Sequence, residues 1–110
     1  MKYRLLITDA AIQDLEEIFD WIAEHDSPAK ADALLDRILQ VTESIAALPG
    51  RGSRPPELPA DPSSGVRQVY FKPYRIIYEI DGSRIIVHLI ADGRRNMQSL
   101  LLRRLLGTQQ

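Results

Sequence analysis

The chain has 110 residues, a length that fits one domain built around one hydrophobic core. Hydrophobic residues make up 45% and charged residues 26%, a balance that predicts a folded protein rather than a disordered one. The sequence contains no cysteine, which excludes disulfides and thiolate chemistry. The formal net charge of −1 argues against a general nucleic-acid binder.

Apolar stretches are short throughout the sequence. None approaches the roughly 18 residues that a membrane-spanning helix needs, so no membrane partner is expected. The three apolar residues that follow Arg4 are too few for the core of a signal peptide. We therefore expect a cytoplasmic protein.

Charge is distributed unevenly between the two parts of the chain. Residues 1–48 carry four bases against ten acids, a net charge of −6, and residues 49–110 carry ten bases against five acids, a net charge of +5. An acidic part joined to a basic part indicates one face that attracts anions. The alternative is two solvated faces without a partner.

The first elements are a short strand and a helical hairpin. Residues 3–7 are predicted to form a strand, and Asp9 is expected to cap a helix over residues 10–25. Its apolar stripe consists of Ile12, Leu15, Phe19 and Ile22, with acids mostly on the other side. Ser27 followed by Pro28 indicates the start of a second helix that runs to about Leu48. The short connection predicts two antiparallel helices.

Residues 49–65 are predicted to form a long loop. Eleven of these 17 residues are proline, glycine or serine. Loops beyond about 12–15 residues are uncommon in compact domains and are often functional. The segment is therefore either a plain crossover to the sheet or a binding loop.

Three strands and a final helix follow this loop. The strands are expected over residues 66–71, 74–80 and 84–90, and their short connections require antiparallel pairing. Asp81-Gly82 indicates a type I′ hairpin. Asn96 is expected to cap a leucine-rich helix over residues 97–106. The prediction is an α+β fold of order β-α-α-β-β-β-α, in which a helical hairpin packs on a small antiparallel sheet within a single domain, residues 1–110.

Several segments in this order resemble one family. They are Ala11-Ile12-Gln13-Asp14-Leu15-Glu16-Glu17-Ile18, Leu48-Pro49-Gly50, Val66-Arg67, Tyr74-Arg75-Ile76-Ile77-Tyr78 and Gly93-Arg94-Arg95-Asn96. Along nearly its whole length the chain resembles the RelE/ParE toxin superfamily, in particular the ParE-like, plasmid-stabilisation type. The resemblance implies the toxin of a type II toxin–antitoxin pair, held inactive by a cognate antitoxin in a hetero-oligomer. It implies no cofactor.

The target class depends on individual residues. RelE-like members cut messenger RNA in the ribosome, and ParE-like members inhibit DNA gyrase. Arg67, Arg75 and Arg95 resemble three members of the nuclease's basic cluster, which makes them the catalytic candidates if the chain is an mRNA endoribonuclease. Val69, however, stands where the nuclease has a second lysine, and Leu101 falls near the place of its tyrosine or histidine. We therefore favour a non-enzymatic, ParE-like gyrase inhibitor.

Two other functions stay open. One is the ribosome-dependent mRNA endonuclease, and the other is a family member that retains only antitoxin binding. Asp92 stands where ParE-like members often have a histidine, and its carboxylate would neutralise positive potential beside Arg94 and Arg95. His25 and His88 are far apart and form no metal signature, so no metal is expected. His88 is expected to be a hydrogen-bonded histidine of the sheet.

The residues expected to bind the target or antitoxin are Arg67, Arg75, Arg94, Arg95, Leu101 and Leu105. The arginines should gather at the edge of the sheet, where their planar guanidinium groups suit an acidic partner. The antitoxin would place an apolar, acidic helix in an apolar groove with a basic rim, at the C-terminal helix or in the groove it leaves. In the structural alternatives, Arg75 pairs with Glu79 or a helix carboxylate, and the leucines close the open face of the sheet.

Overall fold

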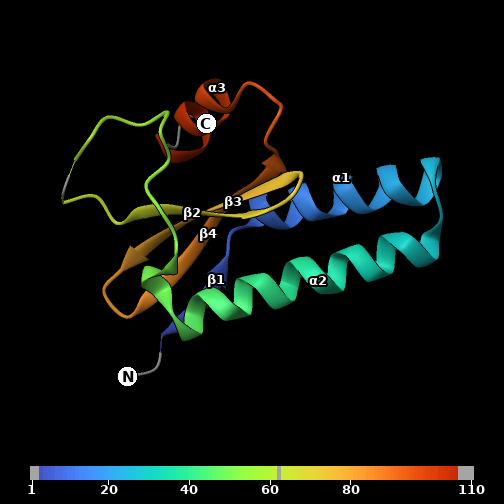
Figure 1. The fold of residues 1–110 in the computed structure, drawn as a ribbon, viewed down its shortest axis with the longest axis horizontal. Coiled ribbons are helices and arrows are strands. Elements are labelled where there is room, and N and C mark those ends of the chain that lie inside the picture. Colours follow the sequence, from blue (N-terminus) through green and yellow to red (C-terminus); the bar gives the residue numbers. More distant parts are fainter. Residues whose placement is uncertain (1–2, 62, 107–110) are drawn as a thin grey trace.

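The computed structural model describes residues 3–61 and 63–106. The elements follow the order β-α-α-β-β-β-α, which confirms the predicted fold class (Figure 1). They are β1 (Arg4–Ile7), α1 (Asp9–His25), α2 (Pro28–Ala47), a short 3-10 helix (Pro49–Arg51), β2 (Val66–Phe71), β3 (Tyr74–Asp81), β4 (Arg84–Asp92) and α3 (Met97–Leu105). No helix within the described residues is both long and apolar enough to span a membrane.

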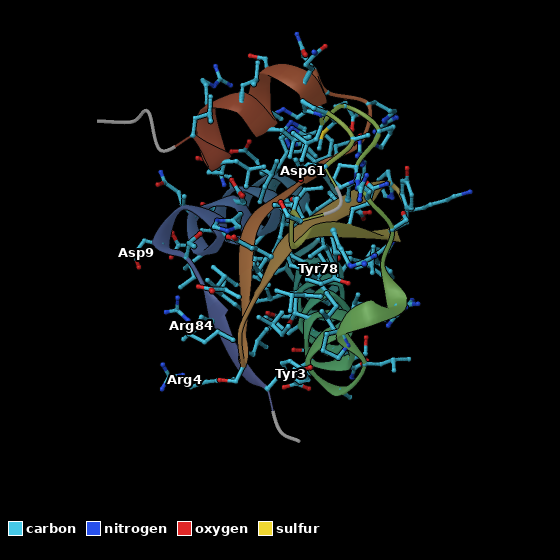
Figure 2. The ribbon with its side chains drawn as sticks, turned by 90° about the vertical axis from the view of Figure 1, so that its left-hand side faces the viewer. Tyr3, Arg4, Asp9, Asp61, Tyr78 and Arg84 are labelled. Atoms are coloured by element: carbon cyan, nitrogen blue, oxygen red, sulfur yellow. The ribbon has the colours of Figure 1, made fainter. Side chains whose placement is uncertain are left out.

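The four strands form one sheet in the order β1-β4-β3-β2. The β2, β3 and β4 strands pair antiparallel, as predicted. β1 adds a parallel pair with β4, so the sheet is mixed rather than wholly antiparallel. Arg4 and Arg84 consequently lie side by side at one end of the sheet (Figure 2). Parallel pairing is possible because a long connection, including the whole helical hairpin, separates β1 from its partner.

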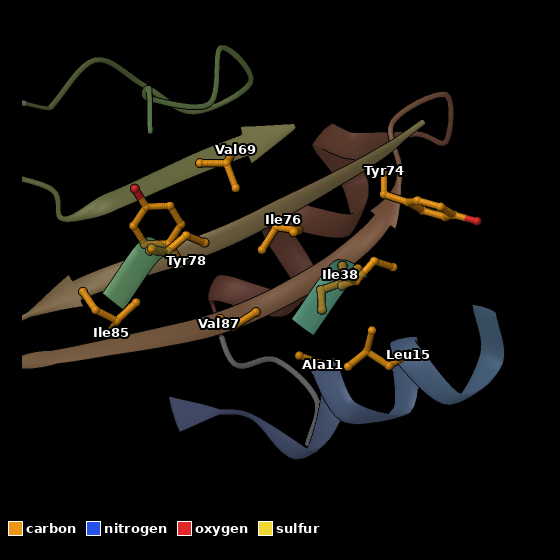
Figure 3. Packing of buried hydrophobic residues seen from close by; sticks show 11 residues of the cluster. Ala11, Leu15, Ile38, Val69, Tyr74, Ile76, Tyr78, Ile85 and Val87 are labelled. Atoms are coloured by element: carbon orange, nitrogen blue, oxygen red, sulfur yellow. The ribbon is translucent and has the colours of Figure 1, made fainter. Parts of the chain in front are cut away.

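The sheet buries a hydrophobic cluster on each face. The hairpin covers one face, where apolar residues of α1 and α2 meet alternate residues of β3 and β4 (Figure 3). Tyr78 lies at one end of this cluster and Tyr74 at the other. α3 lies on the side of the sheet away from α2 (Figure 1) and closes the second face. The second cluster contains Ile77, Leu89, Ala91, Met97, Leu100 and Leu101.

Two of the three predicted helix N-caps are confirmed. The Ser27 hydroxyl accepts the backbone N–H of Lys30 at 3.1 Å, and the Asn96 side chain accepts that of Ser99 at 3.1 Å, as expected. The predicted cap of α1 was wrong by one residue. Thr8 is the N-cap, and its hydroxyl accepts the Ala11 N–H at 3.1 Å, while Asp9 begins the helix. Its carboxylate there still suits the positive end of the helix dipole.

The β3–β4 hairpin differs from the predicted turn type. Asp81 pairs with Arg84, which leaves Gly82 and Ser83 as the two central residues. Gly82 has a φ of 60°, and no residue other than glycine has a positive φ in the described chain. A positive φ at the first central position alone is typical of a type II′ turn, whereas type I′ needs it at both positions.

Candidate functional site

The four candidate arginines do not form one cluster, and that expectation was wrong. Arg67 lies opposite Tyr78 across the β2–β3 ladder, so both side chains share the face covered by the hairpin. Arg75 follows Tyr74, which packs in the hairpin-side core, and therefore points to the other face. The sheet thus separates Arg67 from Arg75.

Arg75 is buried, with 4% of its surface exposed. Its Nη1 and Nη2 donate to the two carboxylate oxygens of Glu57 at 2.7 and 2.8 Å, and its Nε donates to Gln68 Oε1 at 2.8 Å. Nη2 also donates to Gln68 Oε1. The guanidinium lies 5.8 Å from the centre of the Tyr70 ring. All three nitrogens are therefore satisfied within the protein.

The ion pair between Arg75 and Glu57 shifts the pKa of both side chains. The hydrogen bonds from Arg75 lower the pKa of Glu57, and the hydrogen bonds to Glu57 raise the pKa of Arg75.

The pairing of Arg75 with Glu79 that the sequence suggested is wrong. The Glu79 carboxylate lies instead 2.9 Å from Nε2 of His88, which is thereby the hydrogen-bonded sheet histidine that the sequence predicted. The described residues contain no group of three side chains suited to hold a metal ion.

Arg67 is half-buried and engaged with the backbone. Its Nη1 donates to the carbonyl of Gly52 at 3.2 Å. The Tyr78 hydroxyl donates to Pro49 O at 2.6 Å and accepts the N–H of Gly52 at 3.2 Å. Arg67 and Tyr78 therefore hold the start of the long loop against the sheet. The contact between Arg67 and Gly52 thus supports the fold of the loop, which was the structural alternative for Arg67.

Arg94 and Arg95 lie in the turn after β4, where both are exposed. The Asp92 carboxylate accepts the backbone N–H and Nε of Arg94, both at 2.9 Å, and its Nη2 at 2.6 Å. These bonds lower the pKa of Asp92 to about 2. Asp92 thus neutralises Arg94, as the sequence suggested. Arg95 donates its backbone N–H to Asp92 O at 3.1 Å, but its guanidinium forms no salt bridge within the described residues.

A cavity of about 760 Å³ brings these two arginines next to an apolar surface. It lies between α1, one residue of α2, the β2–β3 turn with the start of β3, and the end of β4 with the turn that follows it. Its charged lining is Asp14, Glu17, Asp92, Arg94 and Arg95. Its apolar lining is Ile18, Trp21, Ile22, Leu34, Pro73, Tyr74, Ile90 and Ala91. We call this cavity the Trp21 groove, because Trp21 lines it while 59% of its surface is exposed.

Neither Leu101 nor Leu105 lines the Trp21 groove. Leu101 is fully buried against the sheet, and Leu105 packs on the same cluster. They close the second face of the sheet, which was the structural alternative. The exposed apolar residues of α3 and its C-cap are instead Leu102 and Leu106.

An ion pair that the sequence did not reveal holds α3 to α1. The Asp14 carboxylate accepts Nη1 and Nη2 of Arg104 at 2.8 and 3.0 Å, and also the backbone N–H of Ile90 at 3.0 Å. Nη1 of Arg104 also donates to His88 O at 2.8 Å. These side chains satisfy backbone groups of β4 beyond Val87, where pairing with β1 ends.

Comparison with known proteins identifies the family. The family model of the ParE toxin of the type II toxin–antitoxin system, parDE, matches residues 5–97. The chain belongs to the ParE toxin family. It is the toxin of a type II toxin–antitoxin system. Toxin ParE3 of Caulobacter vibrioides is 29% identical to it over 98 residues, which cover 89% of this chain and 94% of ParE3.

Two solved structures share the toxin's fold. The chromosomal ParDE system from P. aeruginosa matches with a TM-score of 0.71 and 24% identity, over 83% of this toxin and 96% of that chain. The RelBE2 toxin–antitoxin complex from Mycobacterium tuberculosis matches with a TM-score of 0.59 and 17% identity, over 84% and 99% of the two chains. At these identities the likeness supports the fold.

The sequence therefore located part of the toxin's candidate site. It singled out Arg94 and Arg95, which line the Trp21 groove, but not the α1 residues that form its other wall. A large aromatic residue among exposed acids was the available signal, since Trp21 stands beside Asp20 and near Glu24. Its ring is stacked on His25, with 4.1 Å between ring centres.

Proposed function

We propose that this toxin inhibits DNA gyrase without catalysing a reaction, and that its cognate antitoxin neutralises it by binding in the Trp21 groove. The toxin and antitoxin would form a hetero-oligomer in the cytoplasm. Membership of the ParE toxin family supports the gyrase target. One observation favours an inhibitor over a nuclease: Arg67 and Arg75 lie on opposite faces of the sheet.

Cleavage of RNA requires cations beside one phosphate, together with groups that move protons to and from the reacting oxygens. Arg75 cannot supply such a cation while Glu57 and Gln68 occupy all its nitrogens. The positions that a nuclease fills with lysine and with tyrosine or histidine are here buried and apolar, since Val69 is 6% and Leu101 0% exposed. Within the described residues, Arg67 and Arg75 therefore do not combine into one phosphate-binding centre, which favours the inhibitor.

The Trp21 groove has the features of a helix-binding site. Amphipathic helices dock by placing apolar side chains in a groove of this kind. Trp21 is suited to be the central anchor, because tryptophan is enriched among the residues that dominate binding energy. Arg95 adds a positive charge at the rim, and its guanidinium forms no salt bridge within the described residues. An apolar antitoxin helix with an acidic residue facing Arg95 fits this surface.

A plasmid supercoiling assay with purified gyrase tests the target. The toxin is expected to abolish negative supercoiling or to trap gyrase on cleaved DNA, and an equimolar amount of antitoxin should restore supercoiling. Full supercoiling with excess toxin would contradict the proposal. Codon-phased cuts in cellular messages would instead indicate the ribosome-dependent nuclease. Normal growth on induction without antitoxin would indicate a member that retains only antitoxin binding.

A further inference from the structure

We propose that Arg75 and Glu57 are positioning residues for the Trp21 groove: from the opposite face of the sheet they fix the turn that presents Arg95. This inference rests on the proposed antitoxin site. Neither residue lines the groove. Their effect passes through Gly93, which lies between Arg75 and the two arginines of the turn.

The first step is the contact between Arg75 and Gly93. A Cβ atom added at Gly93 would lie 3.0 Å from Cδ and 3.1 Å from Cγ of Arg75, so the aliphatic part of Arg75 lies directly against this glycine. The Gly93 N–H donates to Pro73 O at 2.8 Å, which ties the turn after β4 to the turn between β2 and β3. The backbone of Gly93, between Asp92 and the two arginines of the turn, is therefore packed against the Arg75 side chain.

The second step is that the Arg75 side chain is held at both ends. Its backbone is fixed in β3, opposite Tyr70 on one side and Ala91 on the other. Its guanidinium is fixed by the two-pronged pair with Glu57 and by Gln68. A flexible side chain would yield to pressure from the turn, but a side chain fixed at both ends cannot. Lysine would not serve, because it lacks the planar fork.

The third step is the origin of Glu57 in the long loop. The next residue, Leu58, packs against the cluster under α3, and its N–H donates to Pro55 O at 3.2 Å. Pro55 is itself fully buried. The loop thus presents the Glu57 carboxylate from a packed backbone. The loop is a structural crossover that also supplies the acid needed to hold Arg75.

These contacts couple two faces of the sheet. Loss of the Glu57 charge leaves Gln68 as the main partner of the Arg75 guanidinium, so the side chain is held less firmly and the turn that carries Arg95 samples more conformations. Ordering that turn on binding costs free energy, so affinity for the antitoxin falls. The expected consequence is unusual for a residue outside the groove: a change at Glu57 weakens binding only as long as Arg95 is present.

The test compares Glu57→Gln and Gly93→Ala with Arg95→Ala, and with Glu43→Gln as the control, since Glu43 is an exposed carboxylate on α2. Affinity for the antitoxin encoded with the toxin is measured by titration calorimetry below the melting temperature of every variant. Glu57→Gln and Gly93→Ala should each weaken binding about tenfold, and Glu43→Gln should not change it. In the Arg95→Ala background the effect of Glu57→Gln should vanish, because residues that act through one another are not additive.

The outcomes separate this inference from the proposed site. If Arg95→Ala weakens binding but Glu57→Gln does not, or if the two effects simply add, the positioning role is overturned and the groove stands. If Arg95→Ala leaves affinity unchanged, both the proposed role of Arg95 at the groove and this inference are overturned. If Gly93→Ala does not fold, Glu57→Gln alone decides the question.

Discussion

The Asp14 carboxylate of α1 binds the Arg104 guanidinium of α3, ninety residues further along the chain. The two side chains meet beside the second half of β4, where they also satisfy backbone groups of Ile90 and His88. Asp14 is 9% exposed, so the pair is largely shielded from solvent. It therefore fixes the C-terminal helix on the sheet, next to the Trp21 groove that Asp14 also lines.

Asp14→Asn should lower the free energy of unfolding by about 2 kcal/mol, because it leaves the Arg104 charge partly buried without its counter-ion. Urea denaturation followed by circular dichroism measures this change. Asp20→Asn, at an exposed position of the same helix, should change stability by less than about 0.5 kcal/mol. Equal effects of the two substitutions would show that the Asp14–Arg104 pair does not support the fold.

Acidic pH should lower the folding stability of the toxin through protonation of Glu57. Its pKa is lower in the folded chain than in the unfolded chain, owing to Arg75. The unfolded chain therefore takes up the proton first as pH falls, so the contribution of this carboxylate is complete above its usual pKa and is lost as pH falls through the folded-state pKa. The stability difference between the wild type and Glu57→Gln should thus shrink as pH falls below the usual pKa of a glutamate. A difference that does not change with pH would refute the ion pair.

The two leucines at the end of α3 should respond differently to a charge. Leu105→Asp places a carboxylate against the apolar cluster under α3 and should cost about 2–3 kcal/mol of stability. Leu106→Asp is the matched control, since Leu106 is 67% exposed. Thermal unfolding of both variants measures the contrast. Similar melting temperatures would mean that α3 does not close the sheet.

Trp21 should be the main apolar anchor of the antitoxin. Trp21→Ala is expected to weaken antitoxin binding by at least about 2 kcal/mol, a cost typical of a central aromatic residue at an interface. Ile12→Ala is the control, because Ile12 is also an exposed apolar residue of α1, at 43%, but lies outside the groove. Calorimetric titration provides both values. A larger loss from Ile12→Ala would place the antitoxin elsewhere on the hairpin.

Features that depend on contacts between residues close in the sequence were predicted more accurately than contacts between distant segments. Ser27 and Asn96 cap helices through contacts three residues away, so their roles were visible in the sequence. Thr8 and Asp9 are both good caps, and only the backbone decides between them. The ordered set of motifs was enough to indicate the ParE-like family, although no single motif was specific.

Contacts between distant segments could not be predicted. Arg75 meets Glu57 because a long loop folds over the second face of the sheet, whereas the sequence offered Glu79 as the nearer acid. The same limit applied to β1, whose four residues carry no signal of a parallel partner. The separation of Arg67 from Arg75 was predictable in principle, since it follows from strand register, but register depends on the loops between strands.

Hydrogen–deuterium exchange of the toxin, free and bound to its cognate antitoxin, tests the central claim most directly. Binding in the Trp21 groove should slow exchange in α1 over residues 14–22 and in the turn over residues 92–95, with little change in β2. Protection confined to α3 or to the β2 edge, with α1 and the turn unchanged, would contradict the account.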